Sequence, residues 1–342
     1  MEELHDVIII GAGLCGIAAA RRLRESGKSV VLLDKSRGVG GRMATRRIDL
    51  PAGSEAGGEK VQARLDHGAQ FFTARSEEFR REVSALQEAG AVDAWCAGFP
   101  RTFAEATGDF KADGHPRFRG SDGMSRPAKH LAQDLNIRLN HRVTRIAWAD
   151  DRWSVECEND ALVNGRALLF TSPVPQTLAI LDASEIKSPD AARSALERIE
   201  YDPCIVALVL LSGPSNLGPP GALQARGEPI DFIGDNFIKG ISSVPAVTIH
   251  GGPDFSREYL ENDPEASARL LVDAASELVP AEKIVSVTAH RWRYAKPCVS
   301  HPDRCLVVTE PGPLVFAGDA FGEARVEGAY LSGLAAAEAL TK

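Results

Sequence analysis

The chain has 342 residues, of which 44% are hydrophobic and 25% are charged, a composition typical of a soluble globular protein rather than a disordered one. Its net charge of −8 and its lack of a basic tract argue against nucleic-acid binding. No apolar run approaches the roughly 20 residues that span a bilayer, and acidic residues near the N-terminus do not suit a signal peptide. At about 150 residues per domain, we expect a cytoplasmic protein of two domains with no membrane partner. The sequence does not set its oligomeric state.

The cysteines and histidines indicate neither a disulfide scaffold nor a metal site. The six cysteines are Cys15, Cys96, Cys157, Cys204, Cys298 and Cys305. They are sparse, no two have the CxxC spacing of a zinc site or a redox dithiol, and the histidines form no HExxH motif. We therefore predict that the protein holds no metal.

The first 35 residues predict a strand, a helix and a second strand. Residues 7–10 and 30–33 are continuous apolar runs, as expected for strands buried on both faces of a parallel sheet. Residues 14–26 contain helix formers and end before Gly27, which suits a helix C-terminus. A βαβ unit therefore opens the chain.

Later segments predict further strands and helices. Residues 50–60 are rich in Gly, Pro and Glu and predict an exposed excursion, and Ser76 is expected to cap a helix. We also predict a helix within 121–135, a hairpin of strands 142–147 and 153–157, strands at 167–171, 205–211, 246–250 and 314–317, a helix at 264–279 that buries Leu270, Leu271, Ala274 and Leu278, and a helix at 326–340. The two ends of the chain share a βα pattern that the middle lacks, so we expect an α/β protein whose nucleotide domain is discontinuous.

A glycine-rich motif lies between the first strand and the first helix. It reads Gly11-Ala12-Gly13-Leu14-Cys15-Gly16. In such a GxGxxG loop the first glycine allows the tight turn, the second lets a pyrophosphate approach the backbone, and the third lets the helix pack against the strand. Asp34 ends the second strand, where a carboxylate can accept hydrogen bonds from a ribose. A glycine-rich turn with an ordinary surface acid is the alternative, but the register of all three elements favours an adenine dinucleotide.

Two further motifs indicate which dinucleotide is bound. Gly40-Gly41-Arg42-Met43 follows the ribose acid, and Gly318-Asp319 follows a buried strand near the end. In this order the motifs resemble the flavoproteins of the glutathione-reductase-like fold, which include amine oxidases and hydroxylases. The resemblance implies that Arg42 lies beside the phosphates and flavin and that Asp319 lies near the ribityl chain. FAD is therefore favoured over NAD.

The remaining motifs resemble the renalase family along the whole chain. They are Asp66-His67-Gly68-Ala69-Gln70-Phe71-Phe72-Thr73-Ala74-Arg75, Gly123-Met124-Ser125, His141-Arg142-Val143-Thr144, Ser172-Pro173-Val174-Pro175-Gln176, His290-Arg291-Trp292-Arg293-Tyr294-Ala295 and Arg325-Val326-Glu327-Gly328-Ala329-Tyr330. The resemblance implies noncovalent FAD held by Gly11, Ala12, Gly13, Leu14, Cys15, Gly16, Asp34, Lys35, Gly41, Arg42, Ala69, Gln70, Val143, Gly318, Asp319 and Val326. It implies a substrate side lined by Phe71, Phe72, Thr73, Ala74, Arg75, Cys204, Trp292 and Arg325, although the family often has Thr where Cys204 stands.

This resemblance also implies a fold and a domain division. The fold class is α/β, with an FAD-binding Rossmann domain around a parallel sheet and a substrate domain with a mixed, largely antiparallel sheet. We assign residues 1–75, 117–172 and 290–342 to the FAD domain. Residues 76–116 and 173–289 are assigned to the substrate domain.

The source of electrons follows partly from what the sequence lacks. It has no second GxGxxG motif for a pyridine nucleotide and no CxxC dithiol, which favours an oxidase whose substrate reduces FAD and whose flavin is reoxidised by O2. The renalase resemblance implies oxidation of 2- or 6-dihydro isomers of NAD(P)H to NAD(P)⁺, with hydrogen peroxide as the other product. Arg75 and Arg325 are candidate anchors for phosphate, and no general base is expected. An amine oxidase, a flavin hydroxylase and a flavin-free binding protein on the same scaffold stay open.

Other conspicuous residues have competing interpretations. Trp292, Arg293 and Tyr294 suit either an active-site wall or an amphipathic strand that enters the core. We expect a structural role for His250. Asn236 and Lys239 suit either contacts to a substrate phosphate or amide or solvent-exposed loop positions, and we expect the latter. Lys296 invites comparison with the flavin-proximal lysine of amine oxidases, but the proline that follows it favours a turn.

Overall fold

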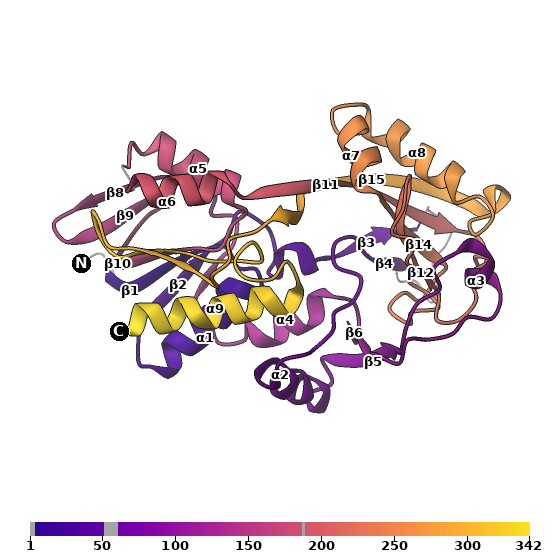
Figure 1. Cartoon of the computed structure of the whole chain (residues 1–342), viewed down its shortest axis with the longest axis horizontal. Coiled ribbons are helices and arrows are strands. Elements are labelled where there is room, and N and C mark those ends of the chain that lie inside the picture. Colours follow the sequence, from indigo (N-terminus) through magenta and orange to yellow (C-terminus); the bar gives the residue numbers. More distant parts are fainter. Residues whose placement is uncertain (1–3, 51–60, 187–188) are drawn as a thin grey trace.

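The computed structural model describes residues 4–50, 61–186 and 189–342, and within them the larger sheet joins both ends of the chain (Figure 1). Its strand order is β16-β17-β10-β1-β2-β7, with β9 added beside β10 and β8 beside β9. The strands are β1 Leu4–Ile10, β2 Val30–Leu33, β7 Ile137–Arg138, β8 Val143–Ala149, β9 Arg152–Cys157, β10 Leu162–Phe170, β16 Leu306–Val308 and β17 Leu314–Phe316. The central strands β17, β10, β1, β2 and β7 run parallel, so their carboxyl ends meet at one edge.

Helices cover both faces of this sheet. On one face α1 (Leu14–Glu25) packs against α9 (Val326–Thr341), and α4 (Ser125–Leu131) packs beside α1. On the other face lie α5 (Val174–Ala183) and α6 (Asp190–Glu197) (Figure 1). The loops that follow the parallel strands lie at their shared carboxyl edge, which is where nucleotides bind in such sheets.

The second sheet is antiparallel and has the order β12-β13-β14-β11-β15. Its strands are β11 Glu200–Leu211, β12 Ala222–Leu223, β13 Ile230–Asp235, β14 Ala246–Gly251 and β15 Ile284–Val299. Helices α7 (Pro253–Tyr259) and α8 (Pro264–Ala274) cover one face, where Phe255, Ala268 and Leu271 join a buried apolar cluster. The long strands β11 and β15 run side by side and lead from the first sheet to the second (Figure 1).

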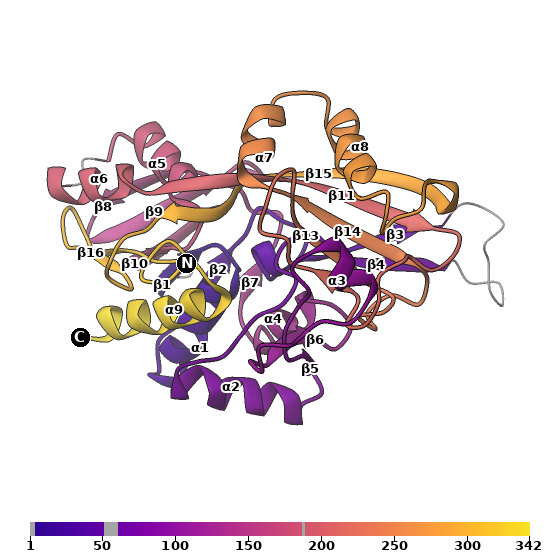
Figure 2. The same ribbon diagram turned by 45° about the vertical axis from the view of Figure 1, so that its right-hand side comes forward.

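Smaller elements complete the fold, and most of them lie below the long strands β11 and β15 in the view of Figure 2. They are the hairpins β3 Thr45–Asp49 with β4 Gln62–Asp66 and β5 Val92–Cys96 with β6 Arg117–Gly120, helices α2 Glu77–Glu88 and α3 Phe103–Thr107, and the short 3-10 helices Gly41–Met43 and Ala281–Lys283. Ala63 and Leu65 of β4 pack against Val206 and Leu208 of β11, so the β3–β4 hairpin is fixed to the second sheet.

The structure confirms the predicted fold class, an α/β protein with a parallel sheet and a largely antiparallel second sheet. The domain division stays a prediction, and its limit at residue 290 falls inside β15. Residues 51–60 of the predicted excursion lie outside the described residues. Among those described, no helix has the length and apolar character needed to cross a bilayer.

Two local predictions were wrong. Helix α8 ends at Ala274, and both Ala274 and Leu270 are exposed, the latter by 43%. Leu271 and Leu278 are buried as predicted, and Ala268 and Val272 complete the buried face of the helix. Strands β12 and β13 were also missed, because their segment is rich in Pro and Gly and their apolar runs are short.

Candidate active site

A cavity of about 2340 Å³ lies at the carboxyl edge of the parallel sheet and is lined by residues of both sheets. Most of the residues predicted to bind cofactor or substrate line it. These are Gly11, Gly13, Leu14, Cys15, Asp34, Lys35, Gly41, Arg42, Ala69, Gln70, Phe71, Phe72, Thr73, Arg75, Val143, Cys204, Trp292, Gly318, Asp319, Arg325 and Val326. Ala12, Gly16 and Ala74 were predicted too but do not line the cavity.

Three loops form one side of the cavity, which we call the glycine edge: residues 11–16, 40–43 and 318–319. Gly11 has φ +113°, a left-handed conformation that favours glycine. A Cβ on Gly16 would lie 2.1 Å from the carbonyl oxygen of Gly11, whereas a Cβ on Gly13 would meet nothing within 4 Å. Open space therefore lies beside Gly13 at the N-terminus of α1, where backbone N–H groups favour an anion such as a diphosphate.

Asp34 fixes the geometry of the glycine edge. Its carboxylate accepts hydrogen bonds from the backbone N–H groups of Ala12 and Ser36, each at 2.7 Å, and the residue is 9% exposed. Each carboxylate oxygen has capacity for a further hydrogen bond. Asp34 can therefore hold the glycine loop and still accept a bond from a ribose hydroxyl.

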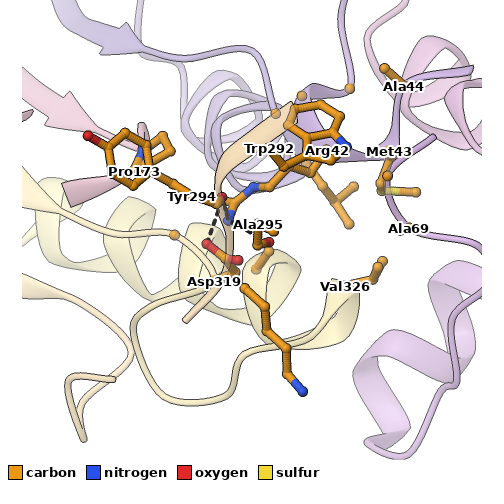
Figure 3. A pocket seen from close by; sticks show the side chains of 18 of the residues that line it. Arg42, Met43, Ala44, Ala69, Pro173, Trp292, Tyr294, Ala295, Asp319 and Val326 are labelled. Atoms are coloured by element: carbon orange, nitrogen blue, oxygen red, sulfur yellow. Dashed lines mark hydrogen bonds and ion pairs between the residues drawn. The ribbon is translucent and has the colours of Figure 1, made fainter. Parts of the chain in front are cut away.

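Arg42 and Asp319 close the glycine edge from opposite ends of the sequence. Their side chains form an ion pair at 2.6 Å, and the Arg42 guanidinium also donates to the carbonyl oxygens of Tyr294 and Ala295 at 3.3 and 3.4 Å (Figure 3). Gly318, with φ +136°, turns the chain directly before Asp319. The pair therefore brings a cation and a carboxylate to the same part of the cavity.

A second part of the cavity lining, which we call the histidine wall, consists of His67, Gln70, His250, His290 and Trp292. The ring centroids of His67, His290 and Trp292 lie 4.5 to 5.2 Å apart, and Trp292 donates from its indole to the carbonyl oxygen of His67 at 2.7 Å. Gln70 Nε2 lies 3.3 Å from His250 Nε2. Rings from β14, β15 and the turn after β4 thus meet on one surface.

Burial holds the histidine wall uncharged. It lowers the pKa of His67 to about 3 and those of His250 and His290 to about 4. Three buried polar atoms of the wall, His67 Nδ1, Gln70 Oε1 and His290 Nε2, have no hydrogen-bond partner among the described residues. Buried polar groups are nearly always paired, so these atoms indicate a ligand in the cavity.

The charge of the cavity is opposite to that of the chain. Thirteen of the described lining residues are Lys or Arg and six are Asp or Glu, although the whole chain has a net charge of −8. Among the described residues, the side chains of Arg75, Arg226 and Lys296 form no hydrogen bond or close ion pair. Asp231 lies near two of them: its burial raises its pKa, and Lys296 and Arg226 oppose that shift.

Several sequence interpretations are settled by these positions. Trp292, Arg293 and Tyr294 all line the cavity. Lys296 also lines it from within β15, so the predicted turn was wrong. His250 also lines the cavity, and its structural role stays a prediction.

The prediction that Asn236 and Lys239 are solvent-exposed was wrong as well. Their exposed fractions are 0% and 2%. Lys239 is paired with Asp66, which is 173 residues away, so no local pattern could have revealed its burial. Arg226 was likewise missed as a cavity residue, because a lone arginine in a Pro- and Gly-rich segment gives no signal.

Comparison with known proteins identifies the family. Residues 76–341, more than three quarters of the chain, match the flavin containing amine oxidoreductase profile, and residues 9–86 match an NAD(P)-binding Rossmann-like domain. The chain belongs to the flavin-containing amine oxidoreductase family. It is therefore a flavin-dependent oxidoreductase, as the open space beside Gly13 and the unpartnered atoms of the histidine wall fit.

Individual members of this family extend the comparison. Renalase of Mus musculus is 24% identical over 99% of both chains, which confirms the resemblance to renalases. A double mutant of putrescine oxidase has a TM-score of 0.64 at 16% identity, with 99% of each chain covered. Cyclohexylamine oxidase from Brevibacterium oxydans IH-35A has a TM-score of 0.63 at the same identity and coverage. At that identity the two structures show a shared fold.

Proposed function

We propose that this flavin-dependent oxidoreductase oxidises the 2- or 6-dihydro isomers of NAD(P)H. In the overall reaction the isomer gives up a hydride and becomes NAD(P)⁺, while O2 takes up that hydride and one proton to become hydrogen peroxide. The end-to-end similarity to mouse renalase and the motifs that resemble renalases support this substrate class.

The observation that favours it most is the charge of the cavity. A dihydro-NAD(P) isomer carries a pyrophosphate, whereas a simple amine at neutral pH is a cation. The cavity lining has thirteen basic and six acidic residues, so it should attract the pyrophosphate and repel the cationic amine. The low-dielectric walls of a cavity strengthen this electrostatic effect. Part of the positive charge is assigned to the cofactor's own diphosphate. Arg75, Arg226, Arg325 and Lys296, on segments outside the glycine edge, are available to the substrate.

We assign FAD to the glycine edge and to the residues predicted for it from sequence. The N–H groups of residues 11–16 would receive the diphosphate, Asp34 the ribose and Arg42 the phosphates. Gly41, Lys35, Ala69, Gln70, Val143, Gly318, Asp319 and Val326 would complete the site. Bound flavin supplies the hydride acceptor and the group that O2 reoxidises.

The side chains then have to hold and orient the substrate rather than move its protons. Arg75 and Arg325 would anchor anionic groups, because a guanidinium forms bidentate hydrogen bonds with phosphate. Phe71, Phe72, Thr73, Cys204 and Trp292 are assigned to the substrate side, whereas Ala74 does not line the cavity and receives no role. The uncharged histidine wall would keep water from the reacting ring without placing a charge beside it. Catalysis would rest on proximity and orientation.

Amine oxidation is the second candidate. The aromatic rings of Trp292 and Tyr294 on the cavity wall favour it, because rings beside a flavin can enclose a neutral amine (Figure 3). Putrescine oxidase and cyclohexylamine oxidase share the fold. The basic lining of the cavity argues against it.

Anaerobic stopped-flow mixing with dihydro-NAD(P) isomers and with amines, from pH 6 to 9, separates the two candidates. The proposed substrate has no ammonium proton to lose and the histidine wall does not titrate in this range, so flavin bleaching should be rapid and nearly independent of pH. Bleaching by amines should instead rise with pH. Rapid bleaching by amines with the isomers inert would overturn the proposal.

We also propose that FAD is bound without a covalent link. Residues 325–333 contain no cysteine, and His67, the nearby histidine, faces its neighbours in the histidine wall. Acid precipitation should release all the yellow colour into the supernatant. Colour that stays in the pellet would contradict this assignment.

A further inference from the structure

Lys239 is a fully buried lysine outside the cavity. Its side chain and that of Asp66 are each 0% exposed, and the two form an ion pair at 2.6 Å. Burial lowers the pKa of Lys239, and the carboxylate of Asp66 opposes that shift. Removing two charged groups from water costs free energy, and a buried ion pair is often no more stabilising than an apolar pair. We therefore expect a role of this pair other than stability.

The contacts of Lys239 converge on one short segment. Its ammonium group donates to Asp66 Oδ2 and to the carbonyl oxygen of Gln70, each at 2.6 Å. The third side of the ammonium faces the ring of Trp95, at 4.7 Å from the centroid. Lys239 therefore binds the turn of residues 66–70 at both of its ends, Asp66 and Gln70.

Asp66 also connects this turn to neighbouring segments of the chain. Its Oδ1 accepts hydrogen bonds from the hydroxyl of Thr45 at 2.6 Å and from the backbone N–H of Met124 at 2.8 Å. Its backbone N–H donates to Asn236 at 3.2 Å, and Asn236 is fully buried on the same segment as Lys239. The ion pair thus joins the β3–β4 hairpin, α4 and the end of β13.

The 66–70 turn supplies His67 and Gln70 of the histidine wall. His67, Gly68, Ala69 and Gln70 all line the cavity. The amide of Gln70 donates to the carbonyl oxygen of Asp66 at 2.6 Å and approaches His250, while its Oε1 has no partner among the described residues. A change in the turn would redirect both that amide and the main chain beside it.

We propose that Lys239 and Asp66 are positioning residues that hold the 66–70 turn, and with it the Gln70 amide, in the orientation that receives the flavin. Neither residue of the pair lines the cavity, so the pair acts on it through this turn and through Thr45, which lines the cavity and donates to Asp66. The proposal rests on the flavin cofactor and not on the identity of the substrate. Its failure would leave the proposed reaction untouched.

Variants of the pair separate positioning from stability. Lys239→Met leaves Asp66 buried without a counter-charge, so we expect both a lower apoprotein melting temperature and an FAD dissociation constant raised about tenfold. In Asp66→Asn/Lys239→Met no charge is stranded, so the melting temperature should recover most of the loss. The tether to Gln70 stays absent, so the dissociation constant should stay raised and the visible spectrum of bound flavin should stay shifted.

Ser215→Ala is the matched control. Ser215 is buried and donates to Asp235 at 2.6 Å, at the start of the segment that leads to Lys239, but it touches neither the turn nor the cavity. It should lower the melting temperature and leave FAD affinity and the flavin spectrum unchanged. The proposal is overturned if Lys239→Met binds FAD as the wild type does, or if the double variant recovers affinity and spectrum together with stability.

Hydrogen exchange of the wild-type apoprotein tests the proposal without any variant. The N–H groups of Asp66 and Ala69 donate to Asn236 and to the carbonyl oxygen of Arg42. If the ion pair fixes the turn before flavin arrives, both amides should exchange slowly in the apoprotein. Rapid exchange that slows only when FAD is added would mean that the cofactor orders the turn, and would overturn the proposal.

Discussion

The glycine edge and the histidine wall face the same cavity but are built in different ways. The glycine edge consists of main chain at the ends of parallel strands, and its loops are specified by neighbouring residues such as Gly11 and Gly13. The histidine wall consists of side chains from β14, β15 and the turn after β4, which are far apart in sequence. A surface of main-chain N–H groups suits a diphosphate in any dinucleotide. A surface of side chains can distinguish one reacting ring from another, so specificity is expected there.

The largest expected effect comes from the glycine edge. Gly16→Val should abolish flavin binding and lower stability, because even a Cβ at this position would lie 2.1 Å from the carbonyl oxygen of Gly11. Gly13→Ala is the matched variant: its backbone angles suit alanine and its Cβ meets nothing, so the apoprotein should melt as the wild type does. FAD should nevertheless bind about tenfold more weakly, since the methyl group occupies the diphosphate space. Titration of both apoproteins with FAD measures the two affinities, and thermal unfolding measures the two stabilities. If Gly13→Ala lost as much stability as Gly16→Val, the prediction would be contradicted.

The second largest effect is expected from acid, which should lower the stability of the folded protein through the histidine wall. The pKa values of His67, His250 and His290 in the folded protein, at about 3 to 4, lie below the value near 6.5 of an unfolded histidine. Between about pH 6.5 and 4 the unfolded chain therefore binds more protons, and the stability that is present above pH 6.5 is lost as pH falls. Each of the three histidines accounts for somewhat less than about 2 kcal/mol between pH 7 and 5, so we expect a total loss of about 5 kcal/mol, measured by urea unfolding. In His67→Gln/His290→Gln the slope should be shallower, and an unchanged slope would disprove the assignment.

Asp34 tests whether the glycine edge binds the ribose. Asp34→Ala removes a charged acceptor, and such bonds are worth roughly 1.5–3 kcal/mol, so FAD affinity should fall about ten- to a hundredfold. Because Asp34 also accepts from Ala12 and Ser36, the melting temperature of the apoprotein should fall as well. Flavin retention equal to that of the wild type would remove Asp34 from the cofactor site.

Arg325 gives the smallest expected effect and concerns the substrate alone. Arg325→Ala should raise the dissociation constant of the dihydropyridine substrate about tenfold, through loss of one charge-assisted anchor. Arg325→Lys keeps the charge without the planar fork and should recover part of the loss. FAD affinity should not change in either variant. An equal loss of FAD affinity would place Arg325 with the cofactor instead.

The contrast between the two surfaces also explains what the sequence could reveal. The first strand, the glycine loop and Asp34 follow one another within 34 residues, so the first βαβ unit could be predicted correctly from local sequence. The partners of Lys239 and the contact between His250 and Gln70 depend on strand pairing and on contacts across 169 to 180 residues. Leu270 shows the same limit on a smaller scale, because two apolar stripes of α8 compete and only the packing of α8 on the sheet selects one.

The ion pair between Arg42 and Asp319 has a consequence for how the protein is made. The two residues are 277 positions apart, so at about 5–20 residues per second Asp319 leaves the ribosome roughly 14–55 s after Arg42. Until the end of that interval β17 is not beside β10, and α9 is not against α1. The nascent chain therefore cannot assemble its flavin pocket during most of its synthesis. Uptake of the cofactor therefore reports that two segments 277 positions apart have met.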